Sequence, residues 1–203
     1  MKQRVAALVA DAFQDSEYFL PKIALQDQLG LDVEVISTKK EPIEIYSYFS
    51  RIGMLDVNKS IDEADPKDYI GVLVPGGAKS PALLAEDPDI IAFLRKINDD
   101  QKLVASICRG SLLVAKSGIA KGRHLTGFHL DKEFPHLVIS HIVEENGGIW
   151  SDDKPVVIDA NLVSSRHPSD IEYFIDGIRQ WLSERTRTTV LSTSEALSLL
   201  NWR

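Results

Sequence analysis

The stretch KLVASICRGSLLVAKSG, residues Lys102–Gly118, decides the fold of this chain. Its apolar run Leu103–Ile107 is typical of a parallel strand that is buried on both faces. Gly110 follows, and the apolar residues after it predict a helix that ends at Gly118. Cys108, the only cysteine of the chain, lies at the joint between strand and helix. This order predicts a nucleophile elbow, a sharp strand-to-helix turn that presents a reactive side chain.

The predicted place of Cys108 has a chemical consequence. A thiol at the start of a helix faces unpaired backbone N–H groups and the positive end of the helix dipole, and both favour the thiolate. The alternative is that Cys108 is a small buried apolar residue, which is the common role of a lone cysteine. The strand–Cys–x–Gly–helix context favours the reactive cysteine without identifying its reaction.

Length and composition exclude several classes of protein. A chain of 203 residues fits one α/β domain with a sizeable core. A single cysteine rules out an internal disulfide and fits a reducing compartment. The net charge of −7 argues against a broad nucleic-acid surface, and no apolar run approaches bilayer-spanning length. No metal-ligand spacing is present either, so we expect a cytoplasmic protein without metal, cofactor, nucleic-acid partner or membrane contact.

Strands and helices alternate along the N-terminal half. Val5–Ala10 is too short for a signal peptide and is predicted to be the first strand. A helix from Asp15 or Ser16 to Gly30 and a strand at Asp32–Ser37 complete a βαβ unit. Further expected elements are irregular or hairpin structure at Ile43–Ile61 with a return strand at Met54–Val57, a loop with a helical turn at Asp62–Asp68, a strand at Tyr69–Val74 and a helix opened by Asp87-Pro88.

The C-terminal half continues the pattern and ends in a tail. The expected elements are a strand near His124–Gly127, an inserted loop at Phe128–Val138, a helix at Ile139–Asn146, a hairpin of Val156–Asp159 with Leu162–Ser165, and a helix opened by Pro168. Residues 183–193 are rich in Ser, Thr and Arg, which predicts a linker before a short helix at Ser194–Leu200. We therefore expect one domain at 1–182 and a tail at 183–203.

Several motifs, taken in order, resemble the DJ-1/PfpI superfamily. They are ADAFQDSEYFLP (Ala10–Pro21), VPGG (Val74–Gly77), SICRG (Ser106–Gly110), KGRHLTGF (Lys121–Phe128), NGGIW (Asn146–Trp150) and KPVVIDANLVSSRHPSD (Lys154–Asp170). The resemblance implies a flavodoxin-like α/β fold with a mostly parallel sheet between helices. It also implies a homodimer or higher homo-oligomer and a reactive cysteine, here Cys108.

The same resemblance implies partners for the thiol. They are a carboxylic acid, here Glu17, and oxyanion-type N–H donors near Gly76, Gly77 and Arg109. Physical chemistry supports the first, because a carboxyl buried beside a thiolate has a raised pKa and, once protonated, can donate a hydrogen bond to sulfur. The alternatives are that Glu17 only complements a helix dipole and that the double glycine is only a tight turn.

Departures from the family pattern weigh against amide hydrolysis. PfpI-type peptidases have histidine directly after the cysteine, where this chain has Arg109, and a glutamate near the position of Ala82. His167-Pro168-Ser169 lacks the glutamate of glutamine amidotransferases. His129 and His167 are the candidate auxiliary residues, or else loop histidines without a role. Arg109 could bind a carboxylate, stabilise an anionic intermediate or form an interface salt bridge.

These features predict a stress-protective protein of the DJ-1/PfpI type. The Cys108 thiolate would attack small electrophilic carbonyl compounds, free or as adducts on damaged protein, in a glyoxalase- or deglycase-type hydrolysis. One alternative is a redox sensor without turnover, in which Cys108 itself is oxidised. A further alternative is an intracellular cysteine peptidase or amidase, for which a general base is hard to name.

Overall fold

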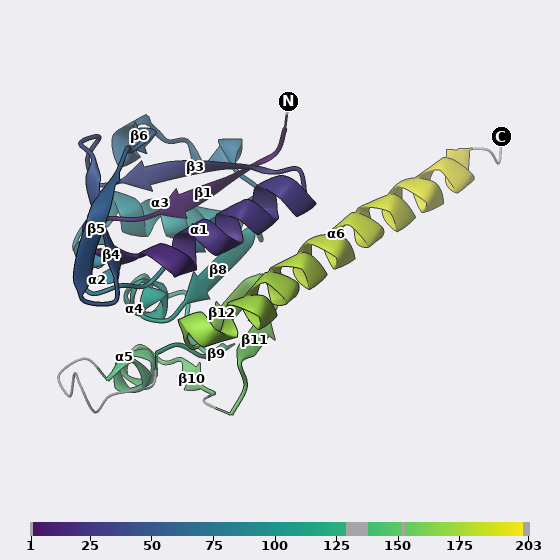
Figure 1. Ribbon diagram of the computed structural model, residues 1–203. Helices are drawn as coiled ribbons and strands as arrows, with labels where there is room; N and C mark the ends of the chain where they lie inside the picture. The colour runs from purple at the N-terminus through teal and green to yellow at the C-terminus, as the bar shows by residue number, and fades with distance from the viewer. Residues whose placement is uncertain (1, 129–137, 152, 201–203) are drawn as a thin grey trace.

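A seven-stranded sheet forms the centre of the molecule (Figure 1). The computed structural model describes residues 2–128, 138–151 and 153–200, with side chains described as far as Arg185. The strand order is β11-β12-β8-β7-β1-β3-β6. Its strands are β1 (Arg4–Leu8), β3 (Asp32–Ser37), β6 (Lys59–Ser60), β7 (Gly71–Val74), β8 (Leu103–Ile107), β11 (Val156–Asp159) and β12 (Leu162–Ser165). Only β11 runs antiparallel to its neighbour, so the mostly parallel sheet predicted from the sequence is confirmed.

Two small sheets flank this one. The first consists of β2 (Phe13–Gln14), β4 (Ile43–Ser47) and β5 (Ser50–Leu55), and the second of β9 (His124–Leu125) and β10 (Ile149–Trp150). The hairpin expected within Ile43–Ile61 is therefore present. Its return strand, however, begins at Ser50 rather than at Met54.

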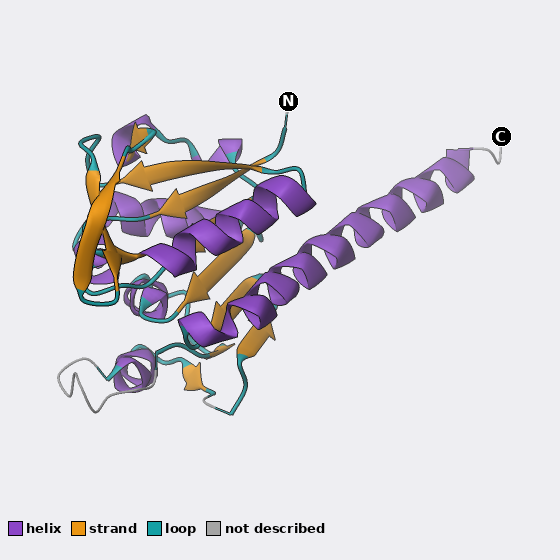
Figure 2. Ribbon diagram, in the orientation of Figure 1, coloured by secondary structure: helices purple, strands orange, loops and turns teal. Residues whose placement is uncertain are grey.

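Helices cover both faces of the central sheet (Figure 2). One face carries α1 (Asp15–Ile23), which continues as the π-helical turn η1 (Ala24–Gln28), and α6 (Ile171–Leu200). The other face carries α2 (Ser80–Ala85), α3 (Pro88–Asp99), α4 (Gly110–Lys116) and α5 (Ile139–Glu145). Short 3₁₀ turns are η2 (Ile61–Glu63), η3 (Pro66–Asp68) and η4 (Pro168–Asp170). No helix in the described part of the chain is long and apolar enough to cross a bilayer.

The sequence explains where several of these elements begin. Asp87 caps α3, because its Oδ1 accepts hydrogen bonds from the N–H groups of Asp89 (2.9 Å) and Ile90 (3.3 Å), and Pro88 occupies the first helical position. In β1, Ala6 and Leu8 pack on the side of α3 and α4, whereas Val5 and Ala7 pack on the side of α1 and α6. Alternation of this kind buries both faces of the strand, as its continuous apolar sequence predicts.

The C-terminal segment differs from expectation. Helix α6 runs without interruption to Leu200 and extends beyond the edge of the sheet (Figure 1). The linker predicted at 183–193 is wrong, because that segment contains neither Gly nor Pro and its Ser and Thr residues lower helix propensity only slightly. The division into a domain at 1–182 and a tail at 183–203 stays a prediction. Most of the predicted insertion, residues 129–137, lies outside the described residues.

Candidate active site

Cys108 lies at the turn between β8 and α4 with a backbone φ of +59°. Such a conformation is uncommon for a residue other than glycine, and it is held here by flanking hydrogen bonds. The N–H of Cys108 donates to the carbonyl of Ser165 (2.9 Å), and its carbonyl accepts from the N–H of Phe128 (3.1 Å). A Cβ at Gly110 would lie 2.2 Å from the carbonyl oxygen of Val74, so only glycine fits there. The predicted elbow geometry is therefore present.

Glu17 lies beside Cys108. The first turn of α1 carries this carboxyl into the interior, where it is fully buried and in hydrogen-bond contact with the thiol. Its Oε2 accepts a hydrogen bond of 2.7 Å from the N–H of Gly76. A Cβ at Gly76 would lie 2.8 Å from this oxygen, 2.8 Å from the backbone nitrogen of Arg109 and 3.0 Å from the Cβ of Cys108. The close approach of these groups thus depends on glycine at position 76.

Burial changes the ionisation of both acids. Desolvation raises the pKa of Glu17 to about 8, against the lowering effect of its hydrogen bonds and of the Arg109 charge. Desolvation also raises the pKa of the Cys108 thiol, and the Glu17 charge raises it further, whereas the N–H and the charge of Arg109 lower it. The net pKa of the thiol is therefore raised, not lowered as predicted, because desolvation outweighs the N–H at the start of α4. Both groups are in contact, so they titrate as a coupled pair.

The predicted N–H donors are not equivalent. The N–H of Gly76 donates to Glu17, so it cannot also serve a substrate oxygen while that contact is intact. The N–H of Arg109 contacts the cysteine sulfur. Gly77 has a φ of +113° and lies close to the backbone at Ala12, since a Cβ there would lie 2.4 Å from the carbonyl oxygen of Ala12. Of the three, Gly77 stays the predicted donor to a substrate.

An aromatic ring joins two other candidates. The guanidinium carbon of Arg109 lies 4.9 Å from the ring centroid of Phe128, and the His167 ring stacks on the same ring at 6.3 Å. The N–H of Ser169 donates to Nδ1 of His167 (3.3 Å), which places the proton of a neutral imidazole on Nε2. His129 lies outside the described residues. No role for Phe128 was predicted from the sequence, although its place at the end of the KGRHLTGF motif, directly before His129, was a usable signal.

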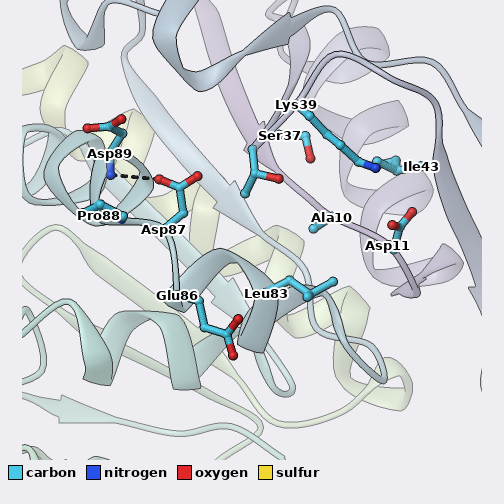
Figure 3. Close-up of a pocket in the computed structure, with 11 residues that line it drawn as sticks. Ala10, Asp11, Ser37, Lys39, Ile43, Leu83, Glu86, Asp87, Pro88 and Asp89 are labelled. Atoms are coloured by element: carbon cyan, nitrogen blue, oxygen red, sulfur yellow. Dashed lines mark hydrogen bonds between the residues drawn. The ribbon is translucent and has the colours of Figure 1, made fainter.

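One surface pocket is separate from this site. A surface pocket of about 590 Å³ opens beyond the carboxyl ends of β1 and β3 (Figure 3). Its lining residues are Ala10, Asp11, Ser37, Thr38, Lys39, Ile43, Leu83, Glu86, Asp87, Pro88 and Asp89. Cys108 and Glu17 do not line it. Among the described residues, no cluster of His, Cys, Asp and Glu could hold a metal ion.

Fold and site together define an α/β protein with a cysteine at a strand-to-helix elbow and a buried carboxyl beside it. The chain belongs to the DJ-1/PfpI family, whose model matches residues 3–180. It is 32% identical over 168 residues to a deglycase of Thermococcus kodakarensis, covering 83% of this chain and 92% of the relative. It is 31% identical over 176 residues to protein/nucleic acid deglycase 2 of Escherichia coli, covering 86% and 94% of the two chains.

A solved structure shows the same fold. It is a two-domain protein of Anabaena variabilis with DJ-1/ThiJ/PfpI-like and ferritin-like domains. The match has a TM-score of 0.77 and 25% identity, and it covers 90% of this chain and 48% of that one. This chain therefore spans about half of the two-domain protein.

Proposed function

We propose that this protein is a stress-protective enzyme of the deglycase or glyoxalase type, in which Cys108 reacts with small carbonyl compounds. The observation that carries the proposal is the contact of the Cys108 thiol with the buried Glu17 carboxyl at a strained elbow. The deglycase relatives support the same reaction class. We further propose that the protein acts in the cytoplasm as a homodimer or higher homo-oligomer.

The coupled pair supplies both functions that carbonyl addition needs. In the reactive form the coupled pair holds a single proton, which lies on Glu17, so that Cys108 is a thiolate. The sulfur bonds to the aldehyde carbon of a 2-oxoaldehyde, and the π electrons of the C=O bond move to oxygen, which takes the proton of Glu17. The resulting Glu17 carboxylate is stabilised by the Gly76 N–H and by the Arg109 charge.

The completed reaction balances with one water and no external oxidant. The aldehyde carbon of the 2-oxoaldehyde is oxidised to a carboxylic acid while the neighbouring ketone is reduced to an alcohol, which gives a 2-hydroxy acid. An adduct of the same compound on an amine gives this acid and the free amine. In both cases the bond from sulfur to carbon is broken again by water, so that Cys108 is regenerated.

Peptidase activity is disfavoured by the residue after the nucleophile. Amide cleavage needs a base that takes the thiol proton and returns it to the leaving amine. The Arg109 guanidinium has N–H donors and no acceptor atom, so it cannot be that base. Addition to an aldehyde has no amine to expel, so Glu17 suffices for it.

The direct test is turnover of methylglyoxal by the purified, reduced protein. We expect formation of the 2-hydroxy acid, its loss in Cys108→Ser and a large decrease in Glu17→Gln. Glu144→Gln, which removes an exposed carboxylate on α5, is the matched control and should leave turnover unchanged. Absence of turnover by wild-type protein with a free Cys108 would contradict the proposal.

A redox sensor is the second candidate function. The observation that favours it is that the Arg109 N–H and the Glu17 carboxyl both contact the sulfur, so they can hydrogen-bond the oxygens of an oxidised cysteine. Mild peroxide would then add two oxygens at Cys108, measured as a mass increase on its peptide. A Cys108 that stays unoxidised under these conditions would eliminate this candidate.

A further inference from the structure

A nearly buried cation lies directly beside the nucleophile. The Arg109 side chain is only 9% exposed, and its guanidinium carbon lies 4.9 Å from the centroid of the Phe128 ring. Phe128 is itself fixed to the elbow, because its N–H donates to the carbonyl of Cys108 (3.1 Å). The His167 ring stacks on Phe128. The elbow and the aromatic ring thus fix the place of the guanidinium relative to the sulfur.

Arg109 and Glu17 are the charged or ionisable neighbours that act on the sulfur. Arg109 carries a permanent charge, whereas Glu17 keeps its proton up to a pKa of about 8. The electrostatic effect of Arg109 reaches both Glu17 and Cys108. Because the side chain is nearly buried, its interaction with a charge on an incoming molecule is weakened by solvent less than at an exposed surface.

We propose that Arg109 makes Cys108 selective for electrophiles that carry a carboxylate next to the carbon attacked, as 2-oxo acids with an aldehyde carbon do. The inference deepens the proposed function and rests on the reactivity of Cys108. A guanidinium has five N–H donors in its plane, so it can bind a carboxylate bidentately while its face stays on the Phe128 ring. A histidine in the same place would be largely uncharged at neutral pH.

The covalent step with such a compound is an addition. The thiolate sulfur of Cys108 bonds to the aldehyde carbon, the π electrons of the C=O bond move to the oxygen, and that oxygen takes the proton of Glu17. The product is a hemithioacetal whose carboxylate lies against Arg109. No oxidant or further reactant is needed.

The test compares alkylation of Cys108 by iodoacetate, an anion, and by neutral iodoacetamide. Both reactions form the same bond from sulfur to carbon and release iodide, so the ratio of their rates reports the effect of the carboxylate. We expect the ratio of the iodoacetate rate to the iodoacetamide rate to be higher for Cys108 in wild-type protein than for 2-mercaptoethanol, a small thiol without a neighbouring cation. Arg109→Gln should lower the ratio by about tenfold or more, the effect of losing a close ionic contact. Arg109→Lys should keep part of the preference.

Arg179→Gln is the matched control. It also removes one positive charge, but from α6, where Arg179 pairs with Asp176. Its ratio should equal that of the wild type. If the Arg109 variants fail to fold, wild-type protein still decides, because glyoxylate should then slow iodoacetamide alkylation at lower concentration than methylglyoxal does.

The outcomes separate this inference from the proposed function. A ratio equal to that of 2-mercaptoethanol, or one unchanged in Arg109→Gln, would overturn the role of Arg109 even if methylglyoxal is turned over. A ratio that depends on Arg109 would support it even if no turnover is found. Protection by methylglyoxal at lower concentration than glyoxylate would also overturn it.

Discussion

Replacing Glu17 by glutamine should stabilise the protein at neutral pH. The carboxyl is fully buried, and desolvation raises its pKa from 4.5 to about 8. Glutamine has nearly the same shape, and its amide can accept the Gly76 hydrogen bond while donating to the sulfur of Cys108. The substitution therefore removes an ionisable group and leaves the contacts in place.

The sign follows from where the proton is lost. In the unfolded chain Glu17 loses its proton near pH 4.5, whereas in the folded protein it keeps the proton to about pH 8. The folded state thus binds more protons between these values, and wild-type stability falls as pH rises through this window. Each pH unit above the unfolded pKa of 4.5 costs about 1.4 kcal/mol. At pH 7 the burial of Glu17 therefore lowers the unfolding free energy of the wild-type protein by about 3 kcal/mol. The Glu17→Gln variant has no such cost, because its side chain does not ionise.

The assay is urea unfolding of wild-type protein and Glu17→Gln at several pH values from 4 to 8. The difference in unfolding free energy should be smallest near pH 4 and should grow in favour of the variant towards pH 8. Other titrating groups are common to both proteins and cancel. The control Glu144→Gln, at an exposed site on α5, should show little change with pH. A difference for Glu17→Gln that does not vary with pH would refute a buried, protonated carboxyl.

A pair of substitutions probes the packing around the site, and a pair of truncations probes the end of the chain. Gly76→Ala should destabilise the fold by about 2 kcal/mol and abolish turnover, because its Cβ would lie 2.8 Å from Glu17 Oε2 and from the backbone nitrogen of Arg109. Gly30→Ala has only its φ of +67° to overcome, with no atom within 4 Å, and should cost about 1 kcal/mol without loss of turnover. Equal melting temperatures and activities for the two variants would contradict this packing. Truncation after Leu182 should leave a folded domain that melts slightly below a truncation after Arg185, which keeps the contacts of Arg185 with Gln101 (2.6 Å) and Trp181 (5.3 Å). Loss of folding in both truncations would show that the tail belongs to the domain.

The central sheet and the elbow could be predicted from the sequence because their signals are local. Continuous apolar runs such as Leu103–Ile107 predict buried parallel strands, and Asp87-Pro88 predicts the start of α3. Glycine at position 110 could also be predicted to be necessary, because a nucleophile elbow brings the strand and helix backbones close together. Glu17 was identified from the family resemblance, since nothing in its own neighbourhood shows which residue it will meet.

What could not be predicted depends on contacts distant in sequence. Phe128 meets Arg109 and His167 only after folding, and the protonation of Glu17 follows from a burial that no spacing reveals. Helix α2 was missed because it is short and its Pro81 suggests a turn. The linker predicted at 183–193 is wrong for another reason. The Ser, Thr and Arg content of this segment suggests a linker, but no residue in it breaks helix α6.

The most direct test of the coupled acid and thiol is the pH dependence of iodoacetamide alkylation of Cys108 in wild-type protein and in Glu17→Gln. If Glu17 is a protonated donor to the sulfur, glutamine is the weaker donor, and the midpoint of the Cys108 reactivity should move to higher pH in the variant. If Glu17 is instead a carboxylate at the pH of reaction, its replacement removes a repelling charge, and the midpoint should move to lower pH. An upward shift is the predicted result. A downward shift, or none, would contradict the claim that Glu17 and Cys108 act as an acid and its thiolate.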